Sequence, residues 1–422
     1  MSDFARKECA SLVLGLEDAA TGDQRVCKQL IVDISTLAQN DAGTGIQRVV
    51  RAIVMSFQTK DIKNFSVKLV AADRSTSYRY LPEWWVSGRQ MDEPLNLCSR
   101  KTVHVEEGDV FLGLDFAAAI APRHEKLLAT WKRAGVSLHF LVYDLLPLTN
   151  PQWFSLAMRR NFRRWLGLLD RQADQIIAIS QYVAGDVEAW RRRWRIGRRR
   201  YIDVTTIPLG GDISASSPTQ GLPHDAEAII GWMRNRPTAM MVATIEPRKG
   251  HDVVLAAFQR LRRTLGDNAP QLLVVGRPGW KTKHLQARMS RASRSDNAFL
   301  WLQDATDEYL DRLYAEAAGV VIASRDEGFG LPLAEAALHR KWVLVRDRPV
   351  FREQGLTNVI YFDDDRAEQL AGKLKSLIEA SAQCPPPPST PPTWEECAQR
   401  LLEHVDAIAT PPNRNVATRV VL

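Results

Sequence analysis

The chain has 422 residues, of which 45% are hydrophobic and 25% are charged, and its formal net charge is +7. These values are ordinary for globular proteins and exclude a collagen-like chain, global disorder and a small disulfide scaffold, while the length predicts two or three domains of about 100–200 residues each. No apolar run reaches the roughly 18–20 residues of a membrane-spanning helix, and the first residues lack a signal-peptide layout, so we expect a cytoplasmic protein. The five cysteines are scattered and form no Cys/His spacing typical of zinc sites, so we expect no disulfide framework and no metal.

The first half of the chain alternates apolar runs, rich in β-branched residues, with amphipathic segments. Strands are predicted at residues 29–36, 67–73, 109–115, 137–147 and 175–180, and a helix at 124–135. Strands that alternate with helices indicate a parallel sheet covered on both faces.

A second series of the same kind begins near residue 237. It predicts strands at 238–247, 271–276, 297–303, 319–324 and 342–347, and helices at 251–266, 307–317 and 331–340. The chain is therefore predicted to be an α/β protein with two sheets.

Two stretches with unusual composition divide the chain. Residues 211–236 are rich in Gly, Ser and Pro at their start and lack hydrophobic periodicity, as a linker would. A stiff Pro-rich break at 384–392 precedes a helix at 393–409, which Thr393 is placed to cap. We therefore predict a first domain at 1–225, a second at 226–383, a crossover and final helix at 384–409, and a tail at 410–422.

The most informative motif is SRDEGFGLPLAEAALHR, residues 324–340. A strand, a glycine-bearing loop and a helix start form an anion site, because backbone N–H groups and the helix dipole face the ligand. Glu327 lies in the loop and Glu335 is expected in the first turn of the helix, where carboxylates accept hydrogen bonds from sugar or ribose hydroxyls. The alternative is a capping carboxylate plus a surface acid.

Arg248 and Lys249 follow a strand and precede a helix in ATIEPRKGH, residues 243–251. Open α/β sheets bind ligands at the carboxyl ends of their strands. Positive charge at a helix start opposes the dipole, so it indicates an anion such as a diphosphate, which these residues would also stabilise as it leaves. Two exposed basic residues are the alternative.

The first domain offers weaker motifs. Gly43 and Gly45 flank Thr44 before a helix, where glycine permits close approach of a ligand, but Arg48 interrupts GxGxxG and disfavours a nicotinamide site. A plain turn is as good an interpretation.

Other polar and aromatic side chains are placed to line a site at the sheet edges. Tyr143 and Asp144 end a strand, and Gly276 and Arg277 follow one in the second series. Flat aromatic faces suited to pyranose rings are Trp153, Phe154, Trp84 and Trp85. Core packing and capping explain the same residues equally well.

Arginines gather in Arg191–Arg200, which reads RRRWRIGRRR, and four more lie at 159–164. Such a patch attracts polyanions, and Trp190 and Trp194 would suit a layer of anionic headgroups. A solvated basic surface is the alternative.

Together these motifs resemble the retaining glycosyltransferases of family 4. EGFGLPLAE resembles that family's E-x7-E signature and IEPRKGH its Arg/Lys phosphate motif. DIS…TGIQRVVR and VYDLLPL are similar to a bacterial subgroup that builds surface polysaccharides. The resemblance covers most of the chain and implies the GT-B fold, in which two Rossmann-like βαβ domains face each other across a cleft.

The resemblance also implies roles for the matching residues. Glu327 would bind hydroxyls of the donor sugar, Glu335 the nucleotide ribose, and Arg248 with Lys249 the diphosphate, without a metal ion. Asp144 is expected to be catalytic together with Glu327, Arg248 and Lys249. The other donor-binding residues would be Gly45, Tyr143, Gly276, Arg277, Phe329, Gly330 and Leu331, and Trp153, Trp84 and Trp85 would face the acceptor. Many relatives carry His where Tyr143 stands, so Asp144 would take over its part here, or Tyr143 would act less directly.

The implied activity is retaining transfer of a hexose, with mannose from GDP-mannose as our first choice, to a glycan or lipid-linked glycan in bacterial surface polysaccharide synthesis. UDP-hexoses and dTDP-rhamnose are the alternative donors. Two other classes of function are alternatives. One is an epimerase or phosphorylase of the same fold, and the other is a non-catalytic nucleic-acid-binding protein, which only the arginine-rich segment favours. We expect no cofactor, no nucleic-acid partner, and a cytoplasmic position that is peripheral to the membrane if the basic patch binds it.

Overall fold

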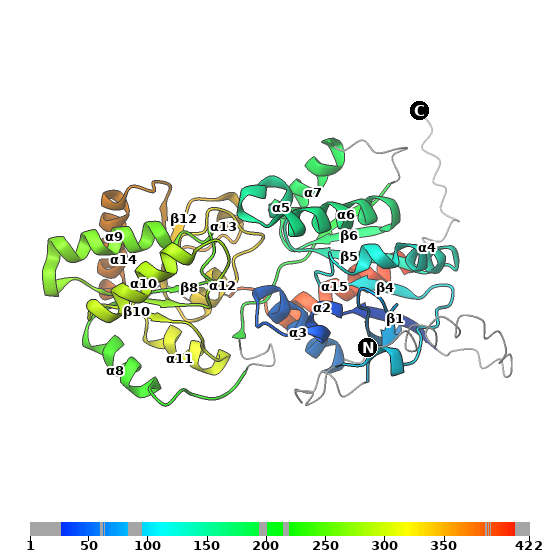
Figure 1. Ribbon diagram of the computed structural model, residues 1–422, viewed down its shortest axis with the longest axis horizontal. Helices are drawn as coiled ribbons and strands as arrows, with labels where there is room; N and C mark the ends of the chain where they lie inside the picture. The colour runs from blue at the N-terminus through cyan, green and yellow to red at the C-terminus, as the bar shows by residue number, and fades with distance from the viewer. Residues whose placement is uncertain are drawn as a thin grey trace, which may run out of the picture.

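The computed structural model describes residues 27–59, 62, 64–82, 95–193, 201–213, 219–384, 386, 388 and 390–409. Within them the chain forms two α/β domains that lie side by side, each built on one sheet (Figure 1). The predicted Trp84 and Trp85, and residues 194–200 of the arginine-rich segment, lie outside the described residues.

The first domain holds a seven-stranded sheet in the order β3-β2-β1-β4-β5-β6-β7. Its strands are β1 (Lys28–Asp33), β2 (Phe65–Ala71), β3 (Arg79–Tyr80), β4 (Val110–Gly113), β5 (Ser137–Val142), β6 (Gln175–Ala178) and β7 (Asp203–Thr206). All neighbours pair in parallel except β3, which runs antiparallel to β2 at the edge. The strands predicted for this half are confirmed, whereas β3 and β7 were not predicted from the sequence.

Helices cover both faces of this sheet (Figure 1). They are α2 (Ser35–Gln39), α3 (Gly45–Thr59), α4 (Glu125–Arg133), α5 (Leu146–Thr149), α6 (Leu156–Gln172) and α7 (Gln181–Arg193). The apolar face of α3 includes Val49, Val50 and Ile53, which are buried in the core together with β1. Helix α3 therefore packs tightly on the sheet, and its opposite face carries the arginines discussed below.

The second domain holds a six-stranded, wholly parallel sheet in the order β10-β9-β8-β11-β12-β13. Its strands are β8 (Thr238–Val242), β9 (Gln271–Val275), β10 (Phe299–Leu302), β11 (Gly319–Ile322), β12 (Trp342–Arg346) and β13 (Val359–Phe362). Its helices are α8 (Ala226–Asn235), α9 (His251–Leu265), α10 (Lys283–Ser295), α11 (Asp307–Glu316), α12 (Leu331–Leu338), α13 (Pro349–Arg352) and α14 (Ala367–Gln383). The predicted elements are confirmed, and β13 adds an edge strand after β12, which the sequence had suggested as the last.

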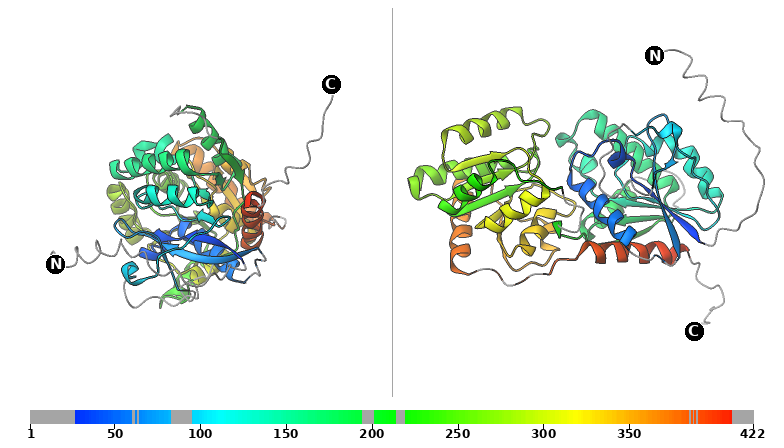
Figure 2. Two further views of the ribbon diagram at one scale, coloured as in Figure 1. Left: turned by 90° about the vertical axis from the view of Figure 1, so that its right-hand side faces the viewer. Right: turned by 90° about the horizontal axis from the view of Figure 1, so that it is seen from below.

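The chain crosses between the domains twice. Leu209 is buried in the first core and Ile213 in a core of the second domain, so the first crossing takes place around Gly210–Asp212. The return crossing leads from α14 to α15 (Trp394–Ala409), which lies along the first domain (Figure 2). Trp394 belongs to the first core, and its indole nitrogen donates to the carbonyl of Asp212 at 3.0 Å, which ties the two crossings together.

Helix α15 begins with a reciprocal cap. The Thr393 hydroxyl accepts a hydrogen bond from the Glu396 amide at 3.1 Å, and the Glu396 carboxylate accepts one from the Thr393 amide at 2.9 Å. This capping box satisfies backbone donors at the helix start, and it confirms the predicted role of Thr393.

Candidate active site

The candidate site lies where loops from the two domains meet. In the second sheet the strand order reverses between β8 and β11, and open α/β sheets bind ligands in the crevice at such a point. The loop after β8 carries Arg248 and Lys249, and the loop after β11 carries Glu327. The topology therefore brings together two motifs that lie almost 80 residues apart in the sequence.

Glu327 is held by both predicted cations. Its Oε2 accepts a hydrogen bond from Arg248 Nη1 at 2.6 Å, and its Oε1 accepts one from Lys249 Nζ. Arg248 also donates from Nε to Glu246 at 3.0 Å, an acidic neighbour that sequence reasoning did not single out. These side chains form a compact, largely buried cluster of charges at the carboxyl edge of the sheet.

The cluster keeps Glu327 ionised. Burial alone would raise the pKa of its carboxyl group, but Arg248 and Lys249 outweigh that effect and lower the pKa to about 2. For Arg248, burial favours the neutral form, whereas Glu327 and Glu246 raise the pKa of the guanidinium above its ordinary value. The site thus presents fixed charges of both signs, as binding of a phosphate next to hydroxyl groups requires.

Asp144 approaches this cluster from the first domain. Burial raises the pKa of its carboxyl group to about 6, and Arg248 only partly offsets that rise. Its Oδ1 accepts a hydrogen bond from the amide of Leu146 at 3.0 Å, at the start of α5. Asp144 is therefore a carboxyl group that changes charge near neutral pH, next to the cations of the second domain.

Tyr143, the neighbour of Asp144, does not offer its side chain to the site. The hydroxyl donates to the carbonyl of Leu114 at 2.8 Å, and the ring is buried in the first core. The prediction that the Tyr143 side chain contacts the donor is therefore wrong, because the strand direction turns this side chain inward. Only the backbone of Tyr143 faces the second domain.

The two domains approach each other closely at Gly328. A Cβ at this position would overlap the carbonyl oxygen of Tyr143, so only glycine permits this approach. The carbonyl of Gly328 accepts a hydrogen bond from the hydroxyl of Ser180 at 2.7 Å. Ser180, at the end of the strand–loop that leads into α7, is a contact residue that the sequence did not reveal.

The next residues of the loop are committed mainly to packing. Phe329 lies against the first core, and its carbonyl accepts a hydrogen bond from Gln354 at 2.7 Å, so that carbonyl is already engaged. Gly330 precedes α12 with a φ of 91°. Leu331 faces Gly45 across the interface, with its Cδ1 at 3.7 Å from the place of a glycine Cβ. A cavity of about 560 Å³ lies behind Phe329, on the side of the Pro-rich crossover.

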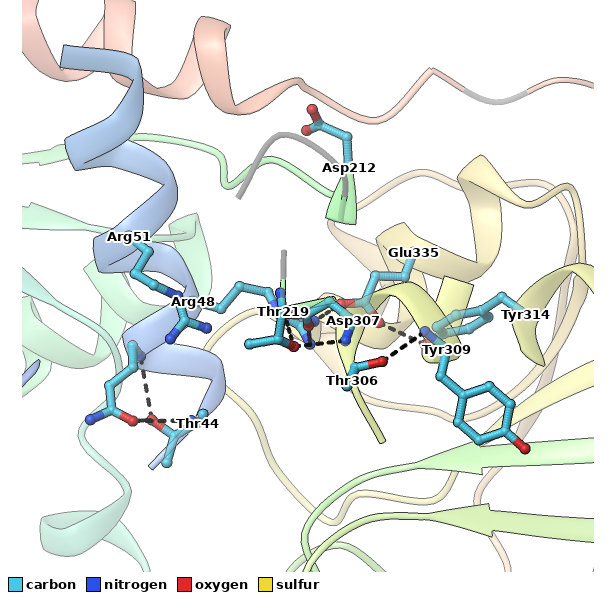
Figure 3. Close-up of polar contacts among 12 residues, drawn as sticks. Thr44, Arg48, Arg51, Asp212, Thr219, Thr306, Asp307, Tyr309, Tyr314 and Glu335 are labelled. Carbon is cyan, nitrogen blue, oxygen red and sulfur yellow. Dashed lines mark hydrogen bonds and ion pairs between the residues drawn. The ribbon is translucent and has the colours of Figure 1, made fainter. Parts of the chain in front are cut away.

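Glu335 anchors a second polar cluster. It is the fifth residue of α12, one turn later than predicted, and it is 2% exposed. Its Oε2 accepts a hydrogen bond from the Tyr314 hydroxyl at 2.7 Å, and its Oε1 accepts one from Arg48 Nη1 at 2.5 Å (Figure 3). Arg48 comes from α3 of the first domain, so this ion pair spans the interface.

Further contacts close the same interface on the side of the β9 loop. Gly276 follows β9, and a side chain there would overlap the carbonyl of Ala243. Arg277 donates to the carbonyl of Ala42 in the first domain at 2.8 Å and pairs with Asp304 at 2.9 Å. Its guanidinium therefore reaches the glycine loop that precedes α3.

Trp153 lies at this end of the interface as well. Its carbonyl accepts a hydrogen bond from the indole of Trp280 at 2.8 Å, and the Phe154 ring lies 6.3 Å from that indole. The aromatic residues thus join the two domains, and Trp280 keeps 44% of its surface exposed. Trp190, considered for membrane contact, is only 6% exposed because it packs into the first core, so that part of the expectation is wrong.

Across the described ranges of the chain, no group of three or more His, Cys, Asp or Glu side chains is arranged to hold a metal ion. The same ranges contain no helix that is long and apolar enough to cross a membrane.

Two Rossmann-like domains that lie side by side are the architecture of the GT-B class of fold. HepE of Anabaena, in complex with UDP-glucose, superposes with a TM-score of 0.57 at 16% identity over 90% of this chain and 97% of HepE. The expected fold is confirmed.

Residues 225–385 match the family described as "Glycosyl transferases group 1", so this part of the chain is a domain of that family. The chain is 34% identical over 411 residues to the serotype-specific mannosyltransferase WbdA of Escherichia coli. The aligned region covers 96% of this chain and 48% of WbdA. It is 33% identical over 135 residues to the O-antigen chain mannosyltransferase B of Escherichia coli, over 32% of this chain and 34% of that protein. The chain thus spans about half the length of WbdA.

Proposed function

We propose that this chain transfers mannose from GDP-mannose, with retained anomeric configuration, to a hydroxyl of a saccharide or lipid-linked saccharide in surface polysaccharide synthesis. The observation that carries the proposal is the cluster of Glu327 with Arg248 and Lys249 at the switch point of the second sheet, next to Asp144. The mannosyltransferase names of the relatives support the choice of sugar. WbdA is about twice as long as this chain, so the proposal extends only to an activity that the matching half of WbdA would carry.

In the proposed reaction, the bond between the sugar C1 and the diphosphate oxygen breaks first. Arg248 and Lys249 stabilise the negative charge that develops on the departing diphosphate. The acceptor oxygen then forms its bond to C1 on the face that the diphosphate leaves, and its proton passes to a diphosphate oxygen. Retention follows because bond breaking and bond formation take place on the same face, and the cations replace a metal ion in this role.

Glu327 and Asp144 have separate tasks in this scheme. Glu327 accepts hydrogen bonds from hydroxyls of the donor sugar and orients C1. Asp144, on the first domain, lies beside the loop of Glu327, with its Cβ 3.3 Å from the place of a Cβ at Gly328, and it positions the sugar from the acceptor side. The contact of Ser180 with Gly328 keeps both loops in register and helps to exclude water, which would otherwise hydrolyse the donor.

A two-stage assay tests the proposal. First, thermal shifts are measured with GDP, UDP, dTDP and CDP in the presence of EDTA; GDP at about 100 times its Kd should add ~2.7 kcal/mol of stability. A shift with UDP or dTDP instead would replace GDP-mannose by a UDP-hexose or dTDP-rhamnose. Second, transfer from GDP-mannose to a mannose-terminated acceptor is followed by NMR of the new anomeric proton.

Variants of the charge cluster separate catalysis from folding. Glu327→Gln should fold and yet transfer almost nothing, whereas Lys375→Gln, on the exposed face of α14, should match the wild type. Near-normal turnover by Glu327→Gln, or a product with inverted configuration, would contradict the proposed mechanism.

We also propose that the first domain docks on an anionic membrane surface, where a lipid-linked acceptor would lie. Arg160, Arg163 and Arg164 are exposed on α6 near Leu156, which is 74% exposed, and Arg191–Arg193 end α7. Basic side chains next to an exposed apolar one suit headgroups of acidic lipids. Co-sedimentation with phosphatidylglycerol vesicles at 150 mM salt should be lost in a variant with these α6 arginines changed to glutamine, and equal binding to neutral vesicles would refute the proposal.

A further inference from the structure

Arg48 joins the two domains through two carboxylates that are buried in the second domain. From α3 of the first domain its guanidinium donates to Glu335 Oε1 at 2.5 Å and to Asp307 Oδ1 at 2.7 Å (Figure 3). Both acceptors belong to the second domain: Asp307 is the first residue of α11, Glu335 lies in the middle of α12, and their side chains are 8% and 3% exposed. One planar side chain therefore bridges two carboxylates that come from different elements, which matches the fork geometry of a guanidinium.

Each carboxylate is also fixed from its other side. The second oxygen of Asp307 accepts hydrogen bonds from the amide and the hydroxyl of Thr219, both at 2.9 Å. The second oxygen of Glu335 accepts from the hydroxyl of Tyr314 at 2.7 Å. Asp307 thus serves as a rigid support for Arg48, and Glu335 is held between one residue of each domain.

His339 packs against Tyr314 and holds its ring in place. The ring of His339 stacks on the ring of Tyr314, with centroids 5.1 Å apart and planes inclined by 10°. His339 in turn pairs with Asp311 at 3.2 Å. The bulky residue at this position therefore fixes the tyrosine that orients Glu335.

The remaining capacity of Glu335 suits a pair of hydroxyls. A carboxylate has about four acceptor positions, two on each oxygen. Among the described residues the side-chain oxygens of Glu335 accept from Arg48 and Tyr314, one at each oxygen, which leaves one position per oxygen. Two adjacent hydroxyls, such as the 2′ and 3′ hydroxyls of a ribose, can each donate a hydrogen bond to one of the two oxygens of the Glu335 carboxylate.

We propose that Arg48 is a positioning residue for the nucleotide: it reaches across the interface to orient Glu335 for a ribose diol, so this acceptor is complete only when the domains are together. The inference rests on the proposed donor site and deepens it, because it assigns to the first domain a part in recognising the ribose. Breaking a buried pair from one side leaves the other charge unpaired, so removal of Arg48 disturbs Glu335 directly.

The test compares nucleotide binding by variants with a matched control. Arg48→Gln removes the bridge, and Arg48→Lys keeps the charge but not the fork. The control is Arg51→Gln, one turn further along α3, because Arg51 has the same side-chain exposure of 16% but pairs with Asp41 in its own domain. Titration calorimetry is carried out with GDP and with 2′,3′-dideoxy-GDP, which lacks the diol.

For Arg48→Gln we expect the Kd for GDP to rise about tenfold to a hundredfold, as for lost hydrogen bonds to a charged group. The KM for the donor should rise with it while kcat stays within about threefold, because the ribose is held equally in the ground state and the transition state. Arg48→Lys should recover part of the loss, and Arg51→Gln should bind like the wild type. Removing the diol should weaken wild-type binding strongly but should add little to the loss in Arg48→Gln.

The outcomes that overturn the inference differ from those that overturn the proposed function. If Glu335→Gln loses GDP binding while Arg48→Gln keeps it, the donor site stands and the role of Arg48 is refuted. Equal additional losses for dideoxy-GDP in wild type and Arg48→Gln also refute it, because a structural defect elsewhere would give that pattern. If the wild type binds none of GDP, UDP, dTDP and CDP, the proposed function fails, and the inference fails with it.

Discussion

Replacing Asp144 by Asn should stabilise the protein at neutral pH while it impairs transfer. The carboxyl group of Asp144 has its pKa raised from 3.8 to about 6, first by burial and despite Arg248. Its ionised form is therefore disfavoured in the folded state relative to the unfolded chain. Asn keeps the acceptor for the Leu146 amide, so the substitution removes the charge and retains the hydrogen bond.

The magnitude follows from the size of that shift. A difference of about two pKa units corresponds to about 3 kcal/mol of folding free energy. Because Asp144 keeps part of its surface exposed, we expect Asp144→Asn to raise the free energy of unfolding at neutral pH by ~1–3 kcal/mol. The sign is set by proton uptake: between pH 3.8 and about 6 the folded state binds the proton more tightly. The contribution of Asp144 to stability therefore falls as the pH rises through this window and stays at its unfavourable value above about pH 6.

The assay is the difference in Tm between Asp144→Asn and the wild type as a function of pH. At pH 7 the variant should melt about 2–10 °C higher, and the difference should vanish towards pH 4. Asp267→Asn, whose side chain is 94% exposed, makes the same chemical change on the surface and should show no such trend. A variant that is less stable than the wild type at pH 7, or a difference that does not depend on pH, would refute the reasoning.

Three further substitutions test the interface, the crossover and the charge cluster. Gly328→Ala should place a methyl group against the carbonyl of Tyr143, force the domains apart and abolish transfer, which small-angle scattering would register as a larger radius of gyration. Thr393→Ala should remove the cap it shares with Glu396 and cost about 0.5–2 kcal/mol, measured as a lower Tm. Lys249→Gln should lower the transfer rate by about 10²–10³ with an unchanged circular dichroism spectrum; a rate within threefold of wild type would speak against its contact with the leaving group.

Most of the fold could be predicted because its strands are buried on both faces. Strands such as β1 and β9 contain continuous runs of buried apolar residues, as strands of a sheet covered on both faces do. The strands that escaped prediction lie at sheet edges: β3 has two residues, and β7 and β13 are only half-buried over most of their length. Their pairing partners, rather than their own sequences, decide that they are strands.

The candidate site could be predicted in part for a related reason. Glu327, Arg248 and Lys249 follow strands directly, so the parallel topology alone predicts that their loops lie at one edge of the sheet. Arg48 could not be found in this way, because its partner Glu335 is 287 residues away and in the other domain. Only the relative placement of the domains makes Arg48 part of the site, and the side-chain direction that takes Tyr143 out of it is likewise a property of the folded strand.

The charges between the domains are already paired with one another, and this pairing bears on how a donor would bind. Arg248 and Lys249 are committed to Glu327, so a diphosphate that takes over these cations must leave Glu327 with other hydrogen-bond donors. A buried carboxylate without partners is costly, and sugar hydroxyls are the groups of a nucleotide sugar that can fill that place. In the proposed function the diphosphate and the sugar are therefore recognised together: the diphosphate takes Arg248 and Lys249 from Glu327, and the sugar hydroxyls replace them at its carboxylate. A nucleotide without its sugar would draw the two cations away from Glu327 and leave the carboxylate without hydrogen-bond donors. The same residues that give the protein its buried ion cluster would in this way favour the complete donor over its product, which is the preference that turnover requires.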